Sequence, residues 1–208
     1  MRSRCVFFSK YILPHLVHVA TRQQQLAPYR QRAVLGSEGR VLEIGVGSGI
    51  NLSLYSDKVD CVIGIDPSAE LLQVVADAAC GVSSHVELVE GMAKTIPKVD
   101  NCTDGAVVTW SLCRVTDKIR VLGEVRRVPK PTGCLHFAEH GPAPEDNVRR
   151  WQDRITPIWR RCAGNCHLNR PVTLLIEECG FRMERLDTGY ATGPRPMTFM
   201  YEGVARPK

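Results

Sequence analysis

Short apolar runs alternate along the chain with segments in which apolar residues recur every three or four positions. Runs that are almost entirely apolar are typical of strands buried on both faces of a parallel sheet. They predict strands at residues 40–44, 61–65, 85–89, 105–110 and 134–138. The helical spacing between them predicts helices at residues 51–55, 68–79 and 117–128, with a turn at 130–133. This alternation predicts a parallel sheet covered by helices.

The last third of the chain changes this rhythm. Helices are predicted at residues 147–161 and 172–179, and the second should end at Gly180. Two strand patterns follow, at residues 181–186 and 197–205. A closing strand pair adds an antiparallel edge to the sheet. The expected fold is therefore α/β, with a doubly wound, seven-stranded, mostly parallel sheet of Rossmann-like type and an antiparallel edge strand.

The most informative motif joins the first predicted strand to the segment after it. Gly45, Gly47 and Gly49 form a glycine turn directly after that strand, and Glu43 stands two residues before the first glycine. Asp66 ends the second predicted strand. A βαβ unit with these features binds a ribose-containing cofactor at the carboxyl ends of its strands.

The glycine spacing discriminates between cofactors. A dinucleotide fingerprint requires a third small residue where this chain has Ile50, because the helix must pack close to the strand. An acid such as Glu43 would repel a pyrophosphate, whereas it attracts an ammonium and a sulfonium. The alternatives are an NAD site and a purely structural turn, in which Asp66, Pro67 and Ser68 only start a helix.

The combined pattern resembles motif I of the class I S-adenosylmethionine-dependent methyltransferases. The resemblance implies that the three glycines leave room for the methionine and ribose portion of S-adenosyl-L-methionine. It implies that Glu43 orients the methionine ammonium and that Asp66 accepts hydrogen bonds from the ribose hydroxyls. The expected cofactor-binding residues are Glu43, Gly45, Gly47, Gly49, Asn51, Asp66, Pro67, Met92, Ala93 and Trp110. Met92 and Ala93 stand where the family contacts adenine.

The resemblance extends over residues 36–140. Residues 104–113 resemble the fourth-strand motif of the family, and residues 121–135 resemble its helix-turn-strand segment. Beyond it, three segments resemble the small methyltransferase-like thiol methyltransferases, in a soluble, bacterial-type version: Glu139-His140, residues 151–159 and residues 164–170. A single domain over residues 1–208 is expected. It should have a helical cap at 1–35, a cofactor-binding core at 36–140 and substrate-side helices with the final strand pair at 141–208.

The expected function is transfer of a methyl group from S-adenosyl-L-methionine to a small-molecule acceptor, with an alkyl thiol favoured. The alternatives are a quinone- or lipid-precursor methyltransferase and a non-catalytic cofactor-binding protein. His140 is the candidate base, because it ends the fifth strand at the cofactor edge. Glu139 would either orient His140 or contact the substrate, and the alternative for His140 is that it caps the next segment. His167 and Arg170 are candidates for a substrate lid or a structural turn.

Several side chains allow a pocket role beside a packing role. Ser111 and Cys113 follow the fourth strand and are candidates for the pocket wall, although core packing is the usual place of a cysteine. Trp151 and Trp159 recur at helical spacing, which is typical of core residues and compatible with an apolar pocket wall.

Composition limits the partners. The chain has 27 basic and 22 acidic residues in its 208 positions, and its scattered basic pairs do not predict nucleic-acid binding. Nine cysteines without a secretory signal predict reduced thiols and a cytoplasmic location. Cys162, Cys166 and His167 lack a second ligand pair, so no metal site is expected. The sequence does not indicate an oligomeric state.

The N-terminal segment is basic and then apolar. It lacks the roughly 20 uninterrupted apolar residues that a membrane span requires. Residues 11–35 predict a helical region that is interrupted near Pro28. A lid over the cofactor site is the favoured interpretation of the N-terminal helix, and peripheral contact of residues 6–20 with a membrane is the alternative.

Overall fold

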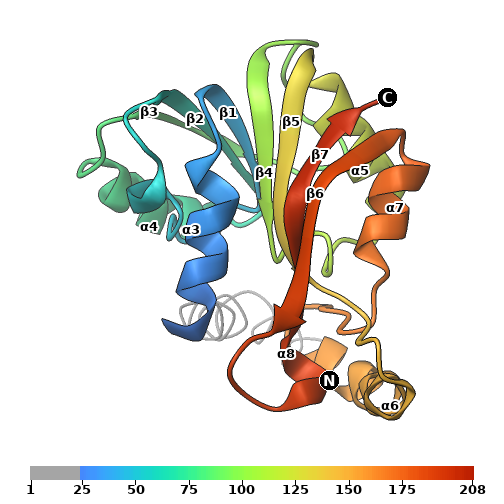
Figure 1. Ribbon diagram of the computed structural model, residues 1–208. Coiled ribbons are helices and arrows are strands. Elements are labelled where there is room, and N and C mark those ends of the chain that lie inside the picture. Colours follow the sequence, from blue (N-terminus) through green and yellow to red (C-terminus); the bar gives the residue numbers. More distant parts are fainter. Residues whose placement is uncertain (1–23) are drawn as a thin grey trace.

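The computed structural model describes residues 24–208, whose strands form one seven-stranded sheet in the order β3-β2-β1-β4-β5-β7-β6 (Figure 1). The strands are β1 (Gly39–Ile44), β2 (Val59–Asp66), β3 (His85–Glu90), β4 (Thr103–Thr109), β5 (Pro129–His140), β6 (Phe181–Tyr190) and β7 (Phe199–Pro207). β1 to β5 pair in parallel, and β7 runs antiparallel to both of its neighbours. The predicted fold class and its antiparallel edge are confirmed.

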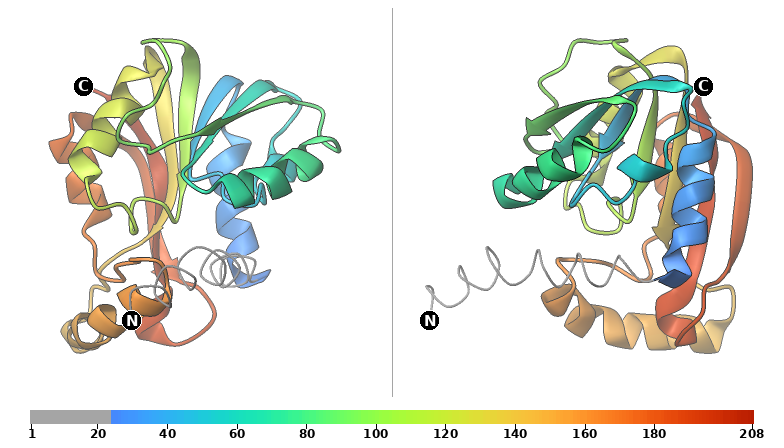
Figure 2. Two further views of the ribbon diagram at one scale, coloured as in Figure 1. Left: turned by 180° about the vertical axis from the view of Figure 1, so that it is seen from behind. Right: turned by 90° about the vertical axis from the view of Figure 1, so that its left-hand side faces the viewer.

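Helices cover both faces of this sheet. The covering helices are α3 (Ala27–Leu35), α4 (Ala69–Ala79), α5 (Lys118–Arg127) and α7 (Val172–Glu178). The other helices, α6 (Asp146–Cys162) and α8 (Arg195–Thr198), lie beyond the ends of the strands, and short 3-10 turns occur at Gln24–Leu26 and Leu52–Leu54. α3 and α5 lie on opposite sides of β5 (Figure 2). On one face, Val41 and Val62 pack with residues of α3 and α4. On the other, Leu42 and Ile63 pack with α5 and α7.

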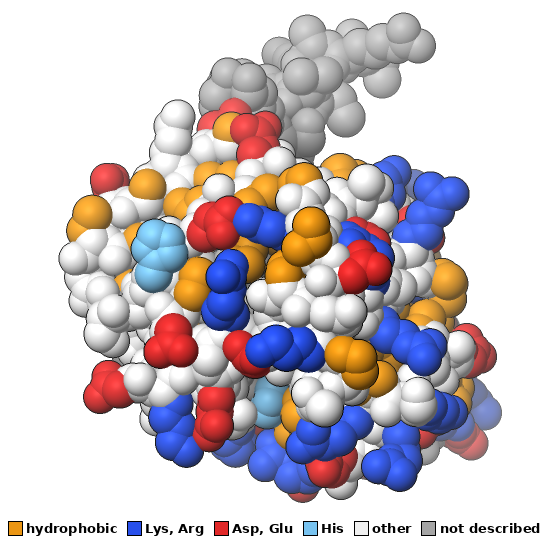
Figure 3. Space-filling view, turned by 90° about the horizontal axis from the view of Figure 1, so that it is seen from above, with side chains coloured by type: hydrophobic (Ala, Val, Ile, Leu, Met, Phe, Trp, Pro, Cys, Tyr) orange, Lys and Arg blue, Asp and Glu red, His pale blue; other side chains and the backbone are white. Residues whose placement is uncertain are grey.

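The parallel strands point their carboxyl ends toward α6 and α8 (Figure 1). The strand order reverses beside β1, since β2 lies on one side of it and β4 on the other. Ligands of open α/β sheets bind at such a reversal, in the crevice beyond the carboxyl ends. At the amino ends of the strands, basic and acidic side chains are interspersed on the surface (Figure 3).

Two short elements differ from their predictions. The helix predicted at 51–55 is only the 3-10 turn Leu52–Leu54. It ends there because the backbone of Tyr55 is extended, which buries the Tyr55 side chain. The turn predicted at 130–133 is the start of β5. A register shift between Thr103 and Gly105 lets β4 pair with this early part of β5.

The ends of the chain differ from their predictions in smaller ways. α3 begins at Ala27 with Pro28 in its first turn. A proline is tolerated there, because the backbone N–H that it lacks would have no acceptor within the helix. The earlier part of the predicted 11–35 helix, including the segment proposed to contact a membrane, lies outside the described residues. β7 begins at Phe199, because α8 occupies the two positions before it.

α6 places its two tryptophans differently. Trp159 and Ile155 pack against the cluster that contains Trp110 and Cys113. Trp151 is 55% exposed, so it belongs neither to the core nor to a pocket wall. The buried face of α6 consists of one apolar residue, Val148, and two polar residues, Gln152 and Thr156, so it does not include Trp151.

Candidate cofactor site

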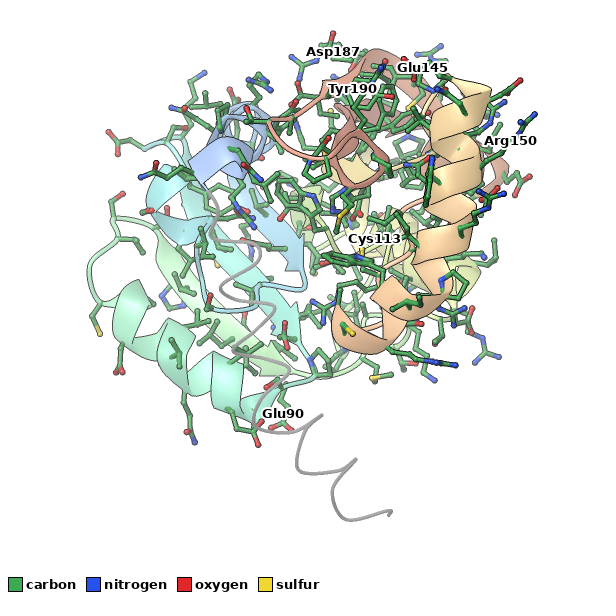
Figure 4. All side chains as sticks on the ribbon, turned by 90° about the horizontal axis from the view of Figure 1, so that it is seen from below. Glu90, Cys113, Glu145, Arg150, Asp187 and Tyr190 are labelled. Atoms are coloured by element: carbon green, nitrogen blue, oxygen red, sulfur yellow. The ribbon has the colours of Figure 1, made fainter. Side chains whose placement is uncertain are left out.

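A cavity of about 510 Å³ lies at the carboxyl ends of β1, β2 and β4, within the usual size range of small-molecule sites. Figure 4 looks onto this end of the molecule. The predicted cofactor residues that line the cavity are Glu43, Gly45, Gly47, Asn51, Asp66, Pro67, Met92, Ala93 and Trp110. They come together because three adjacent strands of the sheet end here.

The three glycines of the motif have separate roles. All adopt left-handed backbone angles, with φ of +70° at Gly45, +59° at Gly47 and +74° at Gly49. A Cβ at Gly45 would lie 2.2 Å from Ser111 Oγ, whereas a Cβ at Gly47 would meet only the Gly45 carbonyl oxygen, at 3.7 Å. Gly47 therefore keeps space open in the cavity. Gly49 does not line it and instead packs against Val75 of α4.

Asp66 is fixed at the end of β2 by two backbone donors. Its Oδ2 accepts a hydrogen bond from Gly47 N at 3.0 Å, and its Oδ1 accepts one from Ser68 N at 2.9 Å. Burial raises the pKa of this carboxyl, and the two backbone N–H groups oppose that rise. Each oxygen retains accepting capacity for a ligand hydroxyl. Ser68 also caps α4, since its Oγ accepts from Leu71 N at 3.3 Å.

Glu43 lies at the end of β1 with 1% of its surface exposed. Its Oε1 accepts from Asn51 Nδ2 at 2.8 Å, and its Oε2 accepts from Tyr55 Oη at 2.9 Å. Burial raises the pKa of this carboxyl to about 7, while the two hydrogen bonds act in the opposite direction. Asn51 Nδ2 also donates to Thr109 Oγ1 at 3.0 Å, so the carboxylate belongs to a network that spans three segments.

Trp110 follows β4 and turns the chain into the cavity wall. Its φ of +47° is uncommon for a bulky residue, and such backbone strain concentrates at functional sites. Its backbone N donates to Ala138 O at 2.9 Å, which holds the turn against β5. The Arg30 guanidinium lies over its ring, with Cζ 4.6 Å from the ring centroid.

Met92 and Ala93 follow β3 on the other side of the cavity. Met92 is 51% exposed, and Ala93 packs partly against the core. Both line the cavity together with Lys94. This location at the end of β3 agrees with the predicted placement, and the contact with adenine stays a prediction.

Glu139 does not reach the cavity. It is fully buried, and its carboxylate accepts from Ser111 N and Leu112 N, each at 2.7 Å, and from Cys113 N at 3.1 Å. Burial raises its pKa to about 7, and these backbone donors oppose the rise. The carboxylate holds the loop after β4 in place, so the geometry does not favour contact with a substrate or with His140.

His140 is half-buried and is not among the residues that line the cavity. Its ring lies edge-on to Trp110, with 6.4 Å between the ring centroids. Burial lowers its pKa to about 4, so the imidazole is neutral at neutral pH. Its buried Nδ1 has no hydrogen-bond partner among residues 24–208. A catalytic role for His140 stays a prediction.

The loop after β4, residues 111–116, is tied to residues 163–170, which follow α6. Asn165 Nδ2 donates to Arg114 O at 2.7 Å, and Arg114 Nε donates to Gly164 O at 3.1 Å. Both segments contribute to the cavity wall through Ser111, Arg114, Gly164 and Asn165. The connection fixes that wall.

Arg170 also connects residues 163–170 to the loop after β4. It is buried, and its Nη1 donates to the carbonyl oxygens of Leu112 and, at 2.7 Å, Val115. His167 N donates to Cys113 O at 2.9 Å. Neither Arg170 nor His167 lines the cavity. Of the two interpretations of these residues, the structural turn fits the geometry.

The cysteines of the described residues are all free. Cys113 lies in the interior beside α6 (Figure 4), with its Sγ 3.5 Å from Cys166 Sγ. It packs in the core and does not line the cavity. Cys162 is exposed and His167 Nδ1 contacts Arg170 Nη2 at 2.5 Å. Residues 24–208 contain no group of three or more side chains placed to hold a metal ion.

Comparison with known proteins decides the family. A family model described as a methyltransferase domain matches residues 42–137. A 2-phytyl-1,4-naphtoquinone methyltransferase of Synechocystis is 30% identical over 78% of this chain and 68% of its own length. The chain belongs to the class I S-adenosylmethionine-dependent methyltransferases. The cofactor of this family is S-adenosyl-L-methionine, as predicted.

Other relatives of this chain include thiol S-methyltransferases. The one from Rattus norvegicus is 31% identical over 73% of this chain. This chain spans 63% of the length of the rat protein. No helix within residues 24–208 is long and apolar enough to cross a membrane.

Solved structures show the same fold. A methyltransferase from Methanosarcina mazei superposes with a TM-score of 0.69, at 23% identity, over 85% of this chain and 95% of the other. The [4+2]-cyclase SpnF superposes with a TM-score of 0.68, at 20% identity, over 88% of this chain and 80% of the other. One fold thus carries different chemistries, and the site must decide the function.

The cavity fits the family's cofactor. Gly47 leaves a space that a Cβ would fill, and two buried carboxylates, Glu43 and Asp66, stand on the cavity wall. Sequence reasoning did not find Arg30, Tyr55 and Thr109, which complete the network around Glu43. Their types and spacing carry no motif, because the sheet alone brings α3, β1 and β4 together.

Proposed function

We propose that the chain transfers the methyl group of S-adenosyl-L-methionine to a small-molecule alkyl thiol. The observation that carries methyl transfer is the cavity itself, in which the glycine loop and the carboxylates of Glu43 and Asp66 meet at the carboxyl ends of the strands. The thiol S-methyltransferase of Rattus norvegicus supports the choice of acceptor.

The cavity wall also supports an acceptor that needs little help from a base. When bound, the cofactor supplies an electrophilic methyl group on a cationic sulfonium. Among residues 24–208, no histidine lines the cavity. An oxygen or nitrogen acceptor commonly needs a positioned base, whereas a thiol reacts once it ionises. The task of the chain is then to orient the acceptor and exclude water.

Glu139 and His140 do not line the cavity, and in this proposal they act through residues that do. Glu139 is a positioning residue, because its carboxylate fixes the backbone of the loop that contributes Ser111 to the wall. His140 supports Trp110 through its ring contact. A direct proton transfer by His140 is the alternative, and the pH dependence of the reaction separates the two roles.

The test is a panel of acceptors with S-adenosyl-L-methionine labelled in its methyl group. Labelled product from a simple alkyl thiol is expected, with a rate that rises with pH as the thiol ionises. A His140→Ala variant is expected to keep that pH profile. Loss of the rise with pH in this variant, at unchanged cofactor affinity, would make His140 the base.

A quinol is the second acceptor to include, because the Synechocystis relative is a quinone methyltransferase. Turnover of the quinol without turnover of the thiol would overturn the acceptor assignment, while the assignment of methyl transfer would stand. Tight binding of S-adenosylhomocysteine without turnover of any acceptor would favour a non-catalytic cofactor-binding protein. Comparison with Gly47→Val identifies any turnover that does not use this cavity.

A further inference from the structure

α3 carries a buried arginine into the cavity. Arg30 is 6% exposed and lies on the inner face of the helix with Ala33 and Val34. The helix starts beside the carboxyl ends of the strands, so this first turn reaches the cavity wall (Figure 1). A guanidinium removed from water is costly unless it has partners, so its position calls for a ligand or a network.

The network is present and lies beside Glu43. Arg30 Nη1 donates to Asn51 Oδ1 at 2.9 Å and approaches Thr109 Oγ1 at 3.4 Å. Asn51 in turn donates to Glu43. Burial lowers the pKa of Arg30 to about 10, with the Glu43 charge opposing the shift, so the guanidinium stays protonated at neutral pH.

Two other cationic side chains, Lys94 and Arg114, line the cavity, and they come from different segments than Arg30. Lys94 follows Met92 and Ala93 at the end of β3. Arg114 donates to Gly164 O, and its charge is among the smaller influences that oppose the rise of the Asp66 pKa caused by burial. Among the described residues that line the cavity, Arg30 is therefore the cation at the end that holds Glu43 and Asn51.

We propose that Arg30 binds the carboxylate of the methionine moiety of S-adenosyl-L-methionine. The amino-acid end of this cofactor carries one carboxylate and one ammonium. Arg30 and Glu43 offer one partner of opposite charge for each, and Asn51 joins the two side chains. A guanidinium has five N–H donors in a planar fork, so it can serve Asn51 and Thr109 together with a carboxylate.

The assignment makes Arg30 a determinant of ligand selectivity. S-adenosylhomocysteine has the carboxylate and the ammonium, its decarboxylated analogue keeps only the ammonium, and 5′-methylthioadenosine has neither. The proposal predicts that the wild-type protein discriminates among these ligands at the carboxylate, and that Arg30 is the source of the discrimination.

The experiment is calorimetric titration of these three ligands into wild-type protein and Arg30→Met. Loss of the charged contact should weaken S-adenosylhomocysteine by roughly 10- to 100-fold, as expected for hydrogen bonds to a charged group. The decarboxylated analogue and 5′-methylthioadenosine should change by less than about threefold, since they lack the group that Arg30 contacts. Binding is measured directly, so no acceptor is needed.

Arg32→Met is the matched control, because Arg32 lies on the same helix and pairs with Glu202 away from the cavity. It should leave all three affinities unchanged. Arg30→Lys keeps a positive charge and serves where Arg30→Met does not fold. It should recover part of the affinity for S-adenosylhomocysteine alone.

The proposal fails if Arg30 variants weaken all three ligands by the same factor, because Arg30 then only maintains the shape of the cavity. It also fails if the affinity for S-adenosylhomocysteine does not change. Either result would leave the acceptor assignment untouched, since that assignment is tested by turnover of thiols.

Discussion

At the scale of single residues, the glycine motif shows how one pattern serves three purposes. Gly45 makes room for Ser111, Gly47 for the cavity, and Gly49 for Val75 of α4. All three have positive φ, so any side chain there pays a similar conformational cost of about 1–2 kcal/mol. The differences between substitutions at these positions therefore report the surroundings of each residue.

Gly47→Val should abolish binding of S-adenosylhomocysteine while the domain stays folded, because the new side chain enters the cavity. Gly49→Val should destabilise the fold more strongly, since its Cβ would already lie 3.1 Å from Val75 Cγ1. Calorimetric titration and thermal unfolding of both variants provide the measurements. Normal ligand binding by Gly47→Val would show that this loop is not the cofactor site.

At the scale of elements, the wall of the cavity depends on a link between two distant segments. Residues 163–170, after α6, hold the loop after β4, because Asn165 and Arg170 donate to its backbone carbonyl oxygens. Arg170 supplies a buried cation for two carbonyl oxygens of that loop. The segment after α6 therefore supports the cavity wall, while no residue of α6 itself lines the cavity.

Arg170→Met should destabilise the protein by about 2–4 kcal/mol, because it leaves two buried carbonyl groups without their donor. It should also weaken S-adenosylhomocysteine, since the loop that carries Ser111 and Arg114 loses support. Urea unfolding and calorimetry measure the two effects. Arg160→Met is the control, because Arg160 is exposed and bonds only Asn165 on this segment. Equal stability of both variants would contradict the supporting role.

At the scale of the whole molecule, histidines with lowered pKa values and buried glutamates with raised pKa values contribute to the pH dependence of stability in opposite directions. Burial lowers the pKa of His136, His140 and His167 to about 4. These groups stay neutral in the folded state, while the unfolded chain takes up protons below about pH 6.5, so they reduce stability as the pH falls from about 6.5 to 4. The raised pKa values of Glu43 and Glu139 act oppositely, reducing stability as the pH rises from about 4.5 to 7.

His136 isolates one of these contributions, because it does not line the cofactor cavity. Its pKa is lowered by burial and then by Arg185 and Arg206. Relative to His136→Gln, the wild-type protein should lose about 3 kcal/mol of unfolding free energy between pH 7 and pH 4, at about 1.4 kcal/mol per pKa unit. Urea unfolding across this range measures the difference. A constant difference would show that the pKa of His136 is the same in the folded and the unfolded state.

The sequence by itself determined the class of fold and predicted the glycine turn that forms the candidate cofactor loop. Both are local: an apolar run marks a buried strand, and Gly45 and Gly47 need left-handed backbone angles wherever the rest of the chain lies. The acid at Asp66 follows from the same βαβ unit. Elements with weak local signals were less predictable, such as the early part of β5, whose pairing depends on a register shift in β4.

Only the tertiary structure decided which polar residues meet at the site. Arg30 is separated from Thr109 by 79 positions, and no spacing rule connects them. Conversely, Glu139 and His140 are the last two residues of β5, which ends at the correct edge, yet neither lines the cavity. The end of a strand fixes where a backbone stops. The direction and partners of each side chain are fixed by packing between elements, and packing is a property of the assembled chain.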